Sequence, residues 1–172
     1  MNYAHRRGST LSQPSSNSFD IKPARSVPEY TATAALFRAY AASLNVDLCF
    51  QGFQQELAAL PGPYAPPDGE LLLAKRGDHV LGCVALKKLE PGVAEIKRLY
   101  VREQARGIGV AKALIEAIIQ AARDRKYKEI KLDTLPQMQA AIALYKGNGF
   151  EPIPAYGSHA YPDLVTLGKK LV

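Results

Sequence analysis

The chain has 172 residues, of which 47% are hydrophobic and 22% charged, as is typical of one globular domain long enough to bury a core. No apolar run approaches the roughly 20 residues that a membrane-spanning helix needs, so we expect no membrane partner. The net charge of +6 forms no stripe of Lys and Arg interleaved with aromatic residues, which argues against a nucleic-acid partner, although a basic protein favours acidic ligands such as a polyphosphate.

The N-terminal segment differs in composition from the rest of the chain. It is rich in Ser, Asn and Gln and poor in large apolar residues. This composition predicts a disordered tail over 1–18 and a single folded domain over 19–172. The tail has neither the apolar segment of a signal peptide nor the amphipathic face of a transit peptide, so we expect a cytoplasmic protein.

Hydrophobic periodicity and turn residues predict an alternating series of helices and strands. In chain order we expect a strand at 19–24, helices at 28–44 and 50–60, strands at 70–77, 79–89 and 93–101, a helix from Val110, a strand at 129–134, a helix at 138–149, and strands at 150–156 and 164–171. Hairpin signals join the three closely spaced strands. The order predicts an α/β fold in which an antiparallel meander leads into a βαβ unit.

The cysteines and histidines indicate neither a disulfide framework nor a metal centre. Cys49 and Cys83 lie in apolar settings without a CxxC spacing, so we expect buried free thiols in a reducing compartment. His5, His79 and His159 are scattered, and none of their spacings is that of metal ligands. We therefore expect no metal.

Two glycines, Gly107 and Gly109, lie between a predicted strand and an amphipathic helix. The first N–H groups of a helix have no partners within it, and glycine lets an anion come close to them, with Arg106 adding a full charge. For a GxG string taken alone, a tight strand-to-helix turn is the favoured explanation of the glycines. No GxxxxGK[ST] string is present, and Lys112 breaks the GxGxxG pattern. The apolar stripe of the helix is Val110, Ala113, Leu114, Ala117, Ile118 and Ala121.

The stretch QARGIG, from Gln104 to Gly109, fits the pattern [QR]xxGx[GA], and through it the chain resembles the GNAT superfamily of acyl-CoA-dependent N-acetyltransferases. The flanking EIKRLYV and VAKALIEAII are similar to that family's fourth strand and third helix. Further on, AAIALYKGNGFEPI resembles the second family signature, a helix carrying Tyr ahead of a Gly-Phe strand start. The resemblance covers roughly Glu70 to Pro152 and is weaker over the N-terminal helices and the last strand.

This resemblance implies a three-layer GNAT fold. Its sheet would be twisted, mixed and mostly antiparallel, with about four helices and a splay between the fourth and fifth strands. Acetyl-CoA, the implied cosubstrate, would pair with strand backbone in the splay and rest its pyrophosphate on the glycine loop. The implied acetyl-CoA-binding residues are Leu99, Tyr100, Val101, Gln104, Arg106, Gly107, Ile108, Gly109, Val110 and Ala111.

The resemblance also implies two catalytic side chains. Glu95, six residues before Val101, lies where one branch of the family places its general base, although a Glu paired with Lys97 or Arg98 explains it as well. Asp133 is a weaker rival base, and a solvated strand end explains it equally well. Tyr145 matches the family's general acid, which protonates the departing thiolate; the alternative is that it only packs in the core. Many members carry Asn where this chain has Met138, so one cofactor contact is in doubt.

The implied reaction transfers an acetyl group from acetyl-CoA to a primary amine by direct attack in a ternary complex. A small-molecule amine is favoured over a protein lysine or N-terminus because no extended acidic docking groove is apparent. Tyr64, Tyr156 and Tyr161 are candidates for shaping the acceptor pocket. A non-catalytic acyl-CoA-binding module is the alternative from another class, and we expect a monomer or homodimer.

Overall fold

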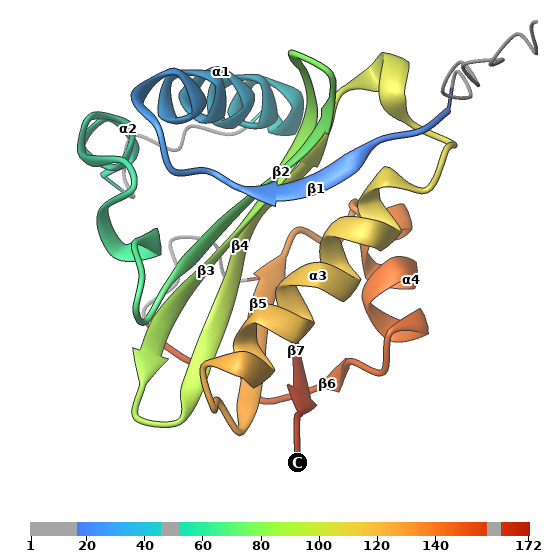
Figure 1. Ribbon diagram of the computed structural model, residues 1–172. Helices are drawn as coiled ribbons and strands as arrows, with labels where there is room; N and C mark the ends of the chain where they lie inside the picture. Colours follow the sequence, from blue (N-terminus) through green and yellow to red (C-terminus); the bar gives the residue numbers. More distant parts are fainter. Residues whose placement is uncertain (1–16, 46–51, 158–162) are drawn as a thin grey trace, which may run out of the picture.

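A single sheet organises the part of the chain that the computed structural model describes, residues 17–45, 52–157 and 163–172. Within these ranges the sheet has seven strands in the order β1-β2-β3-β4-β5-β7-β6 (Figure 1). The strands are β1 (Asp20–Pro23), β2 (Glu70–Arg76), β3 (His79–Glu90), β4 (Val93–Val101), β5 (Glu129–Thr134), β6 (Glu151–Pro152) and β7 (Val165–Lys170).

The helices of the described ranges connect these strands in the predicted order. They are α1 (Val27–Leu44), α2 (Phe53–Ala59), α3 (Val110–Asp124) and α4 (Gln139–Gly147), with short 3-10 turns η2 (Gly62–Tyr64) and η3 (Glu103–Ala105). Residues 1–16 of the tail predicted at 1–18 and the first two residues of the helix expected at 50–60 lie outside the described residues.

The strand pairing is antiparallel except at one place. Strands β1 to β4 form an antiparallel meander. Strand β5 then pairs with β4 in parallel after the chain crosses over through α3, and β7 lies antiparallel between β5 and β6. The predicted meander followed by a βαβ unit is therefore confirmed.

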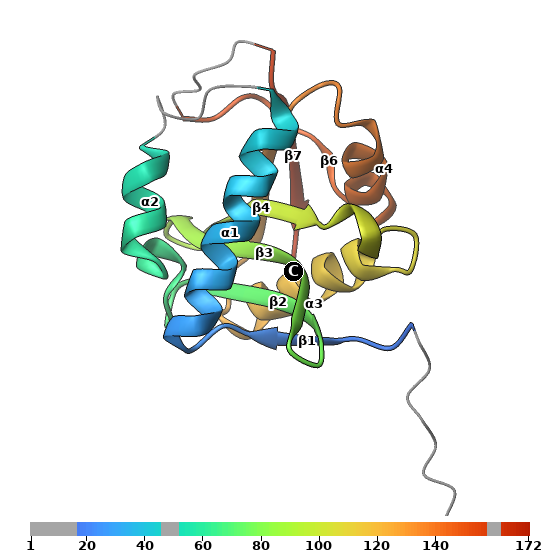
Figure 2. The ribbon, with the colours of Figure 1, turned by 90° about the horizontal axis from the view of Figure 1, so that it is seen from above.

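The sheet separates two pairs of helices, so the protein has three layers (Figure 2). On one face, α1 and α2 cover a core that includes Leu36, Phe37, Phe53 and Leu71. On the other face, α3 packs on β1 to β4, in the core to which the side chains of α4 also contribute. Alternate residues of one strand reach the two cores, as the pleat requires, since Leu72 packs under α3.

Helix α3 buries a wider face than the predicted stripe. Val110, Leu114, Ile118 and Ala121 are buried as expected, but Ala113 and Ala117 are only half-buried. The helix also buries Ile115, Ile119 and Ala122, because it is enclosed by the sheet on one side and by further core residues on another. The residues predicted for the wet face, Lys112, Glu116, Gln120 and Arg123, are all exposed.

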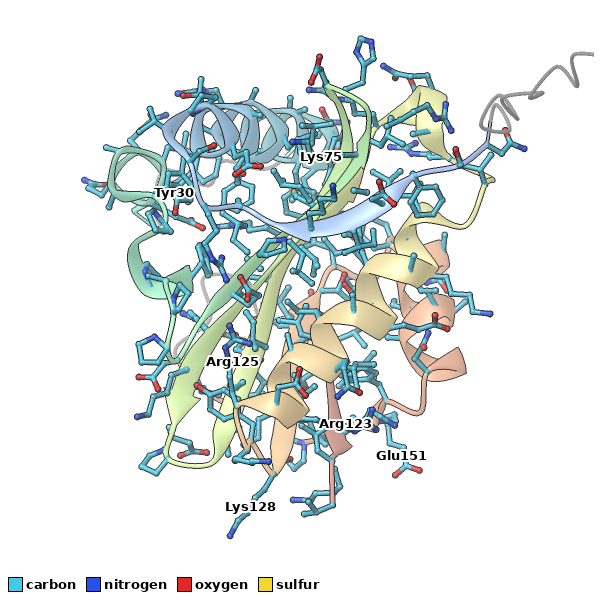
Figure 3. All side chains as sticks on the ribbon, in the orientation of Figure 1. Tyr30, Lys75, Arg123, Arg125, Lys128 and Glu151 are labelled. Carbon is cyan, nitrogen blue, oxygen red and sulfur yellow. The ribbon has the colours of Figure 1, made fainter. Side chains whose placement is uncertain are left out.

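A buried carboxylate ties three segments together at the end of the sheet away from the glycine loop. Glu70 begins β2, and its side chain is only 7% exposed. It accepts hydrogen bonds from Arg25, before α1, and from Arg125, labelled in Figure 3 at the end of α3, each at 2.7 Å. Burial raises the pKa of Glu70, but the bonds from Arg25, the Leu71 N–H and Arg125 outweigh it, so the net shift is downward.

The last strands and the entry to the glycine loop also differ from the sequence prediction. The strand expected at 150–156 pairs only over Glu151–Pro152, where proline limits the ladder. The glycine turn does not follow its strand directly, because η3 inserts one 3-10 turn after β4.

Candidate active site

The candidate active site lies where β4 and β5 part. Their parallel pairing covers only three positions, from Val93↔Glu129 to Glu95↔Lys131, although both strands lie wholly within the described residues. Beyond Glu95, β4 runs on to Val101 beside β3 alone. The predicted splay between the fourth and fifth strands is therefore present, and it leaves one edge of β4 without a neighbouring strand.

A β-bulge bends β4 inside this unpaired stretch. Tyr100 pairs with Cys83 and Lys97 with Ala85, so Arg98 and Leu99 together oppose a single residue of β3. Arg98 has φ 59, in the left-handed region that non-glycine residues rarely adopt. The bulge lies between the predicted base and the predicted backbone contacts of the thioester.

The glycine loop presents a row of free backbone donors. Gly107 (φ +80) and Gly109 (φ +88) both need positive φ, and a Cβ added at either would meet nothing within 4 Å. The N–H groups of residues 107 to 112 have no acceptor among the described residues, and the first helical bond runs from Ala113 to Gly109. An anion fits such a site because unpaired N–H donors follow one another at a helix start and the space beside both glycines is open.

The flanks of this loop differ in detail from the prediction. The N–H of Arg106 donates to the carbonyl of Glu103, so it closes η3 and is not free to bind an anion. The Arg106 side chain is exposed, and its Nε donates to the Val101 carbonyl at 3.2 Å, which brings the guanidinium beside the end of β4. Gln104 is also exposed, whereas Ile108 packs against the core and Val110 is buried.

Glu95 lies on the α1 and α2 side of the sheet and is almost completely buried, with 5% of its side chain exposed. The Tyr156 hydroxyl donates to its Oε1 at 3.0 Å. Two ammonium groups balance its charge: Lys87 at 3.3 Å and Lys97 at 3.6 Å. The ion pair with Lys97 that we weighed against a catalytic role is therefore present, whereas Arg98 pairs elsewhere.

Asp133, the rival carboxylate, lies on the splayed part of β5. Its Oδ1 is 3.6 Å from the same Lys97 ammonium, and its side chain is 17% exposed. Lys97 thus bridges both candidate bases. Lys131, at the last position where β5 pairs with β4, places its ammonium 5.5 Å from the centre of the Tyr156 ring. The cluster combines two carboxylates, three lysines and a tyrosine at the point where the strands part.

Tyr145 enters from the opposite face, on α4, and packs against the Phe150 ring at 5.8 Å between centroids. Burial raises its pKa well above the usual value, and Tyr40 and Asp133 raise it further. Tyr145 is therefore a neutral O–H donor throughout the physiological pH range.

Sequence reasoning missed several neighbours of the site. Tyr40 lies beside Tyr100, with 6.1 Å between ring centroids, and Arg98 pairs with Glu56 at 2.7 Å. These contacts join residues far apart in sequence, so no local pattern indicates them. Tyr64, expected near the acceptor, is instead a core residue at 3% exposure whose hydroxyl donates to Glu56.

The remaining candidates add no chemistry to this site. Cys83 is a free buried thiol, and burial raises its pKa to about 12. Among the described residues no cluster of His, Cys, Asp or Glu resembles a metal site, and none of the helices is long and apolar enough to cross a bilayer. Cys49, His5, His159 and Tyr161 lie outside the described residues.

Comparison with known proteins gives one consistent result. A model of the acetyltransferase (GNAT) family matches residues 35–150. An uncharacterized N-acetyltransferase of Schizosaccharomyces pombe is 38% identical over 135 residues, which cover 77% of this chain and 82% of that protein. A solved acetyltransferase of the GNAT family from Staphylococcus aureus has a TM-score of 0.76 at 18% identity, covering 90% of this chain and 100% of its own. The PaiA N-acetyltransferase of Thermoplasma acidophilum, solved in complex with coenzyme A, has a TM-score of 0.70 at 18% identity, covering 89% and 99%.

Proposed function

The chain belongs to the acetyltransferase (GNAT) family and is an acyl-CoA-dependent N-acyltransferase, and on that premise we propose that it acetylates a small primary amine by direct attack on acetyl-CoA. The observation that carries the proposal is the succession of an unpaired β4 edge and a row of free N–H groups at the start of α3. The first suits an extended chain that carries amides, and the second suits a pyrophosphate.

Acetyl-CoA fits these two features through backbone groups. The unpaired edge of β4 at Leu99, Tyr100 and Val101 offers hydrogen bonds to the pantetheine arm and to the thioester carbonyl. The N–H groups of Gly107, Ile108, Gly109, Val110 and Ala111 lie ready for the pyrophosphate. Arg106 supplies a full charge at the same place, and Gln104 is exposed beside it. Side chains elsewhere in the loop are free to vary.

Attack on the thioester requires an amine that has lost its proton. In the proposed reaction the amine nitrogen bonds to the carbonyl carbon while its proton passes to Glu95, directly or through water. The Leu99 N–H stabilises the negative charge that develops on the carbonyl oxygen. Asp133 is the alternative base, since it is more exposed than Glu95 and shares Lys97 with it.

Collapse of the intermediate breaks the carbon–sulfur bond and releases the thiolate of CoA. Tyr145 gives its hydroxyl proton to that sulfur, and the amide product and CoA then leave. The neutral state that burial imposes on Tyr145 supports this role, because only the protonated phenol donates. No acyl-enzyme is needed, which agrees with the buried, protonated thiol of Cys83.

The proposed acceptor is a small primary amine. We favour a small amine over a protein lysine or N-terminus because the carboxylates at the site, Glu95 and Asp133, are both paired with lysine and form no extended acidic surface for a basic peptide. We also propose that the protein works in the cytoplasm, where a free thiol such as Cys83 stays reduced.

Thiol release from acetyl-CoA, followed with a panel of small amines and with lysine peptides, tests this proposal. We expect turnover with at least one small amine, and a rate of thiol release that increases linearly with enzyme concentration. Tight CoA binding without turnover on any amine would favour a non-catalytic acyl-CoA-binding module. Turnover on peptides alone would overturn the small-molecule assignment but not the chemistry.

A further inference from the structure

One buried ion pair links helix α2 to the strand that borders the splay. The Arg98 guanidinium donates two hydrogen bonds to Glu56, Nη2 to Oε2 at 2.7 Å and Nε to Oε1 at 3.2 Å. The side chains are 8% and 13% exposed. The Tyr64 hydroxyl also donates to Glu56, at 2.5 Å, and the Phe53 ring lies against the guanidinium, 5.4 Å from its centroid. The pair is thus enclosed on both sides.

The charges in this pair are stable despite their burial. Burial raises the pKa of Glu56, but the hydrogen bonds and charge of Arg98 outweigh it, so the net shift is downward. The pKa of Arg98 is raised by Glu56 in spite of the opposing effect of burial. Both groups are therefore ionised at neutral pH, and they attract each other there.

The backbone of Arg98 is the bulge of β4. Its φ of 59 is unfavourable for a residue with a Cβ, and such a conformation persists only when its surroundings hold it. Two contacts do so here: the side chain is fixed by Glu56, and the carbonyl accepts a hydrogen bond from the Cys83 thiol at 3.3 Å. The Arg98 carbonyl and the Leu99 N–H belong to the same peptide group, so the bend and the Cys83 hydrogen bond together set the direction of that N–H.

We propose that the Glu56–Arg98 pair is a positioning device for the acyl group: by fixing the bulge, it aims the Leu99 N–H at the thioester carbonyl. The inference rests on the proposed function, since it concerns the carbonyl that β4 polarises. It assigns α2, which lies across the sheet from α3, an indirect effect on the chemical step. Glu56 and Arg98 act through Leu99 and touch no substrate themselves.

The substitution Glu56→Gln tests this inference, because it keeps the size of the side chain and removes its charge. Glu70→Gln is the matched control. Glu70 is also a buried carboxylate held by arginine, with 7% of its side chain exposed, but it lies at the far end of the sheet. The main readout needs no acceptor: it is the infrared carbonyl stretch of bound acetyl-CoA labelled with carbon-13 at the thioester. Thiol release with the best amine of the panel gives kcat and KM.

We expect the wild type to lower the carbonyl frequency of bound acetyl-CoA and Glu56→Gln to lose that shift. For Glu56→Gln, kcat should fall on the order of 10- to 100-fold, while the Kd for acetyl-CoA stays within about threefold. Glu70→Gln should keep both the carbonyl shift and kcat although it loses stability. Tyr64→Phe, which removes one of the hydrogen bonds to Glu56 and leaves the ion pair, should lose part of the shift.

Several outcomes would overturn the inference. One is a folded Glu56→Gln protein that keeps the wild-type carbonyl shift and kcat. Another is an equal loss in Glu70→Gln, measured at the same folded fraction, since that would make the effect one of stability. If Glu56→Gln does not fold, a full wild-type shift in Tyr64→Phe counts against the inference. Failure of the wild type to bind acetyl-CoA is a different result and refutes the proposed function itself.

Discussion

Replacing Gly107 with alanine separates the conformational role of the glycine loop from its role in binding. Gly107 has φ +80, and a Cβ there meets nothing within 4 Å, so the substitution adds backbone strain without a clash. Left-handed backbone costs an L-residue about 1–2 kcal/mol, which lowers the Tm by about 2–8 °C in a protein of this size. Gly92, in the β3–β4 hairpin, is the matched control, with φ +78 and the same open surroundings.

Only one of the two variants should affect CoA binding. A methyl group at position 107 adds bulk to the loop whose N–H groups we propose to bind the pyrophosphate, and losing one hydrogen bond to a charged group costs about 1.5–3 kcal/mol. That energy corresponds to a Kd about 10- to 150-fold higher. Isothermal titration with CoA and thermal unfolding, run on Gly107→Ala and Gly92→Ala, measure the two effects. The reasoning is refuted if both variants lose the same stability and bind CoA equally well.

Three further predictions concern the catalytic groups and the framework. Tyr145→Phe should lower kcat on the order of 10- to 100-fold with little change in the KM for acetyl-CoA. Tyr127→Phe, which removes a hydroxyl that donates to the Asp68 carbonyl, should leave kcat unchanged. Because burial raises the pKa of Tyr145 above 10.0, its ionisation should not lower the wild-type rate below pH 10. Glu95→Gln should lower kcat/KM by about 100-fold in steady-state assays, and a larger loss in Asp133→Asn would transfer the role of base to Asp133. Glu70→Gln should lose about 3–5 kcal/mol in urea unfolding at neutral pH. Since the pKa of Glu70 is lowered on folding, the wild type gives up this advantage as the pH falls below 4.5, so the two unfolding free energies should converge there.

The order of the elements could be predicted because each one carries its own periodic signal. Helix α3 shows why the prediction stops short of the packing. The apolar stripe from Val110 indicated the helix, but Ile115 and Ile119 are buried as well. A stripe of fixed width describes a helix on a flat surface, whereas α3 is enclosed from more than one direction. The local sequence does not indicate on how many sides the rest of the protein will cover this helix.

The part of the candidate site that is formed by backbone groups, the glycine loop, could be predicted from the sequence. The side-chain contacts between residues far apart in sequence could not. The glycines at 107 and 109 indicate a backbone with positive φ, because few other residues tolerate that conformation. Contacts such as Tyr156 with Glu95, 61 residues apart, or Arg98 with Glu56, 42 apart, arise only once the sheet and its covering helices are assembled. From the sequence, Lys97 and Arg98 were equivalent candidates to pair with Glu95. In the structure Lys97 pairs with Glu95, whereas Arg98, at the bulge, pairs with Glu56 of α2.

The short pairing of β4 with β5 leaves a seam in the sheet between strands β1 to β4 and strands β5 to β7. Backbone pairing crosses the seam only from Val93 to Glu95, while the core beneath α3 continues across it through Ile130, Leu132 and Leu167. A ligand that bonds along the open part of this seam bridges the two groups of strands, and its binding then adds to the unfolding free energy in proportion to the logarithm of its concentration. Resistance to heat and to proteolysis would thus increase with the concentration of acetyl-CoA, so the protein would be most stable when its cosubstrate is abundant.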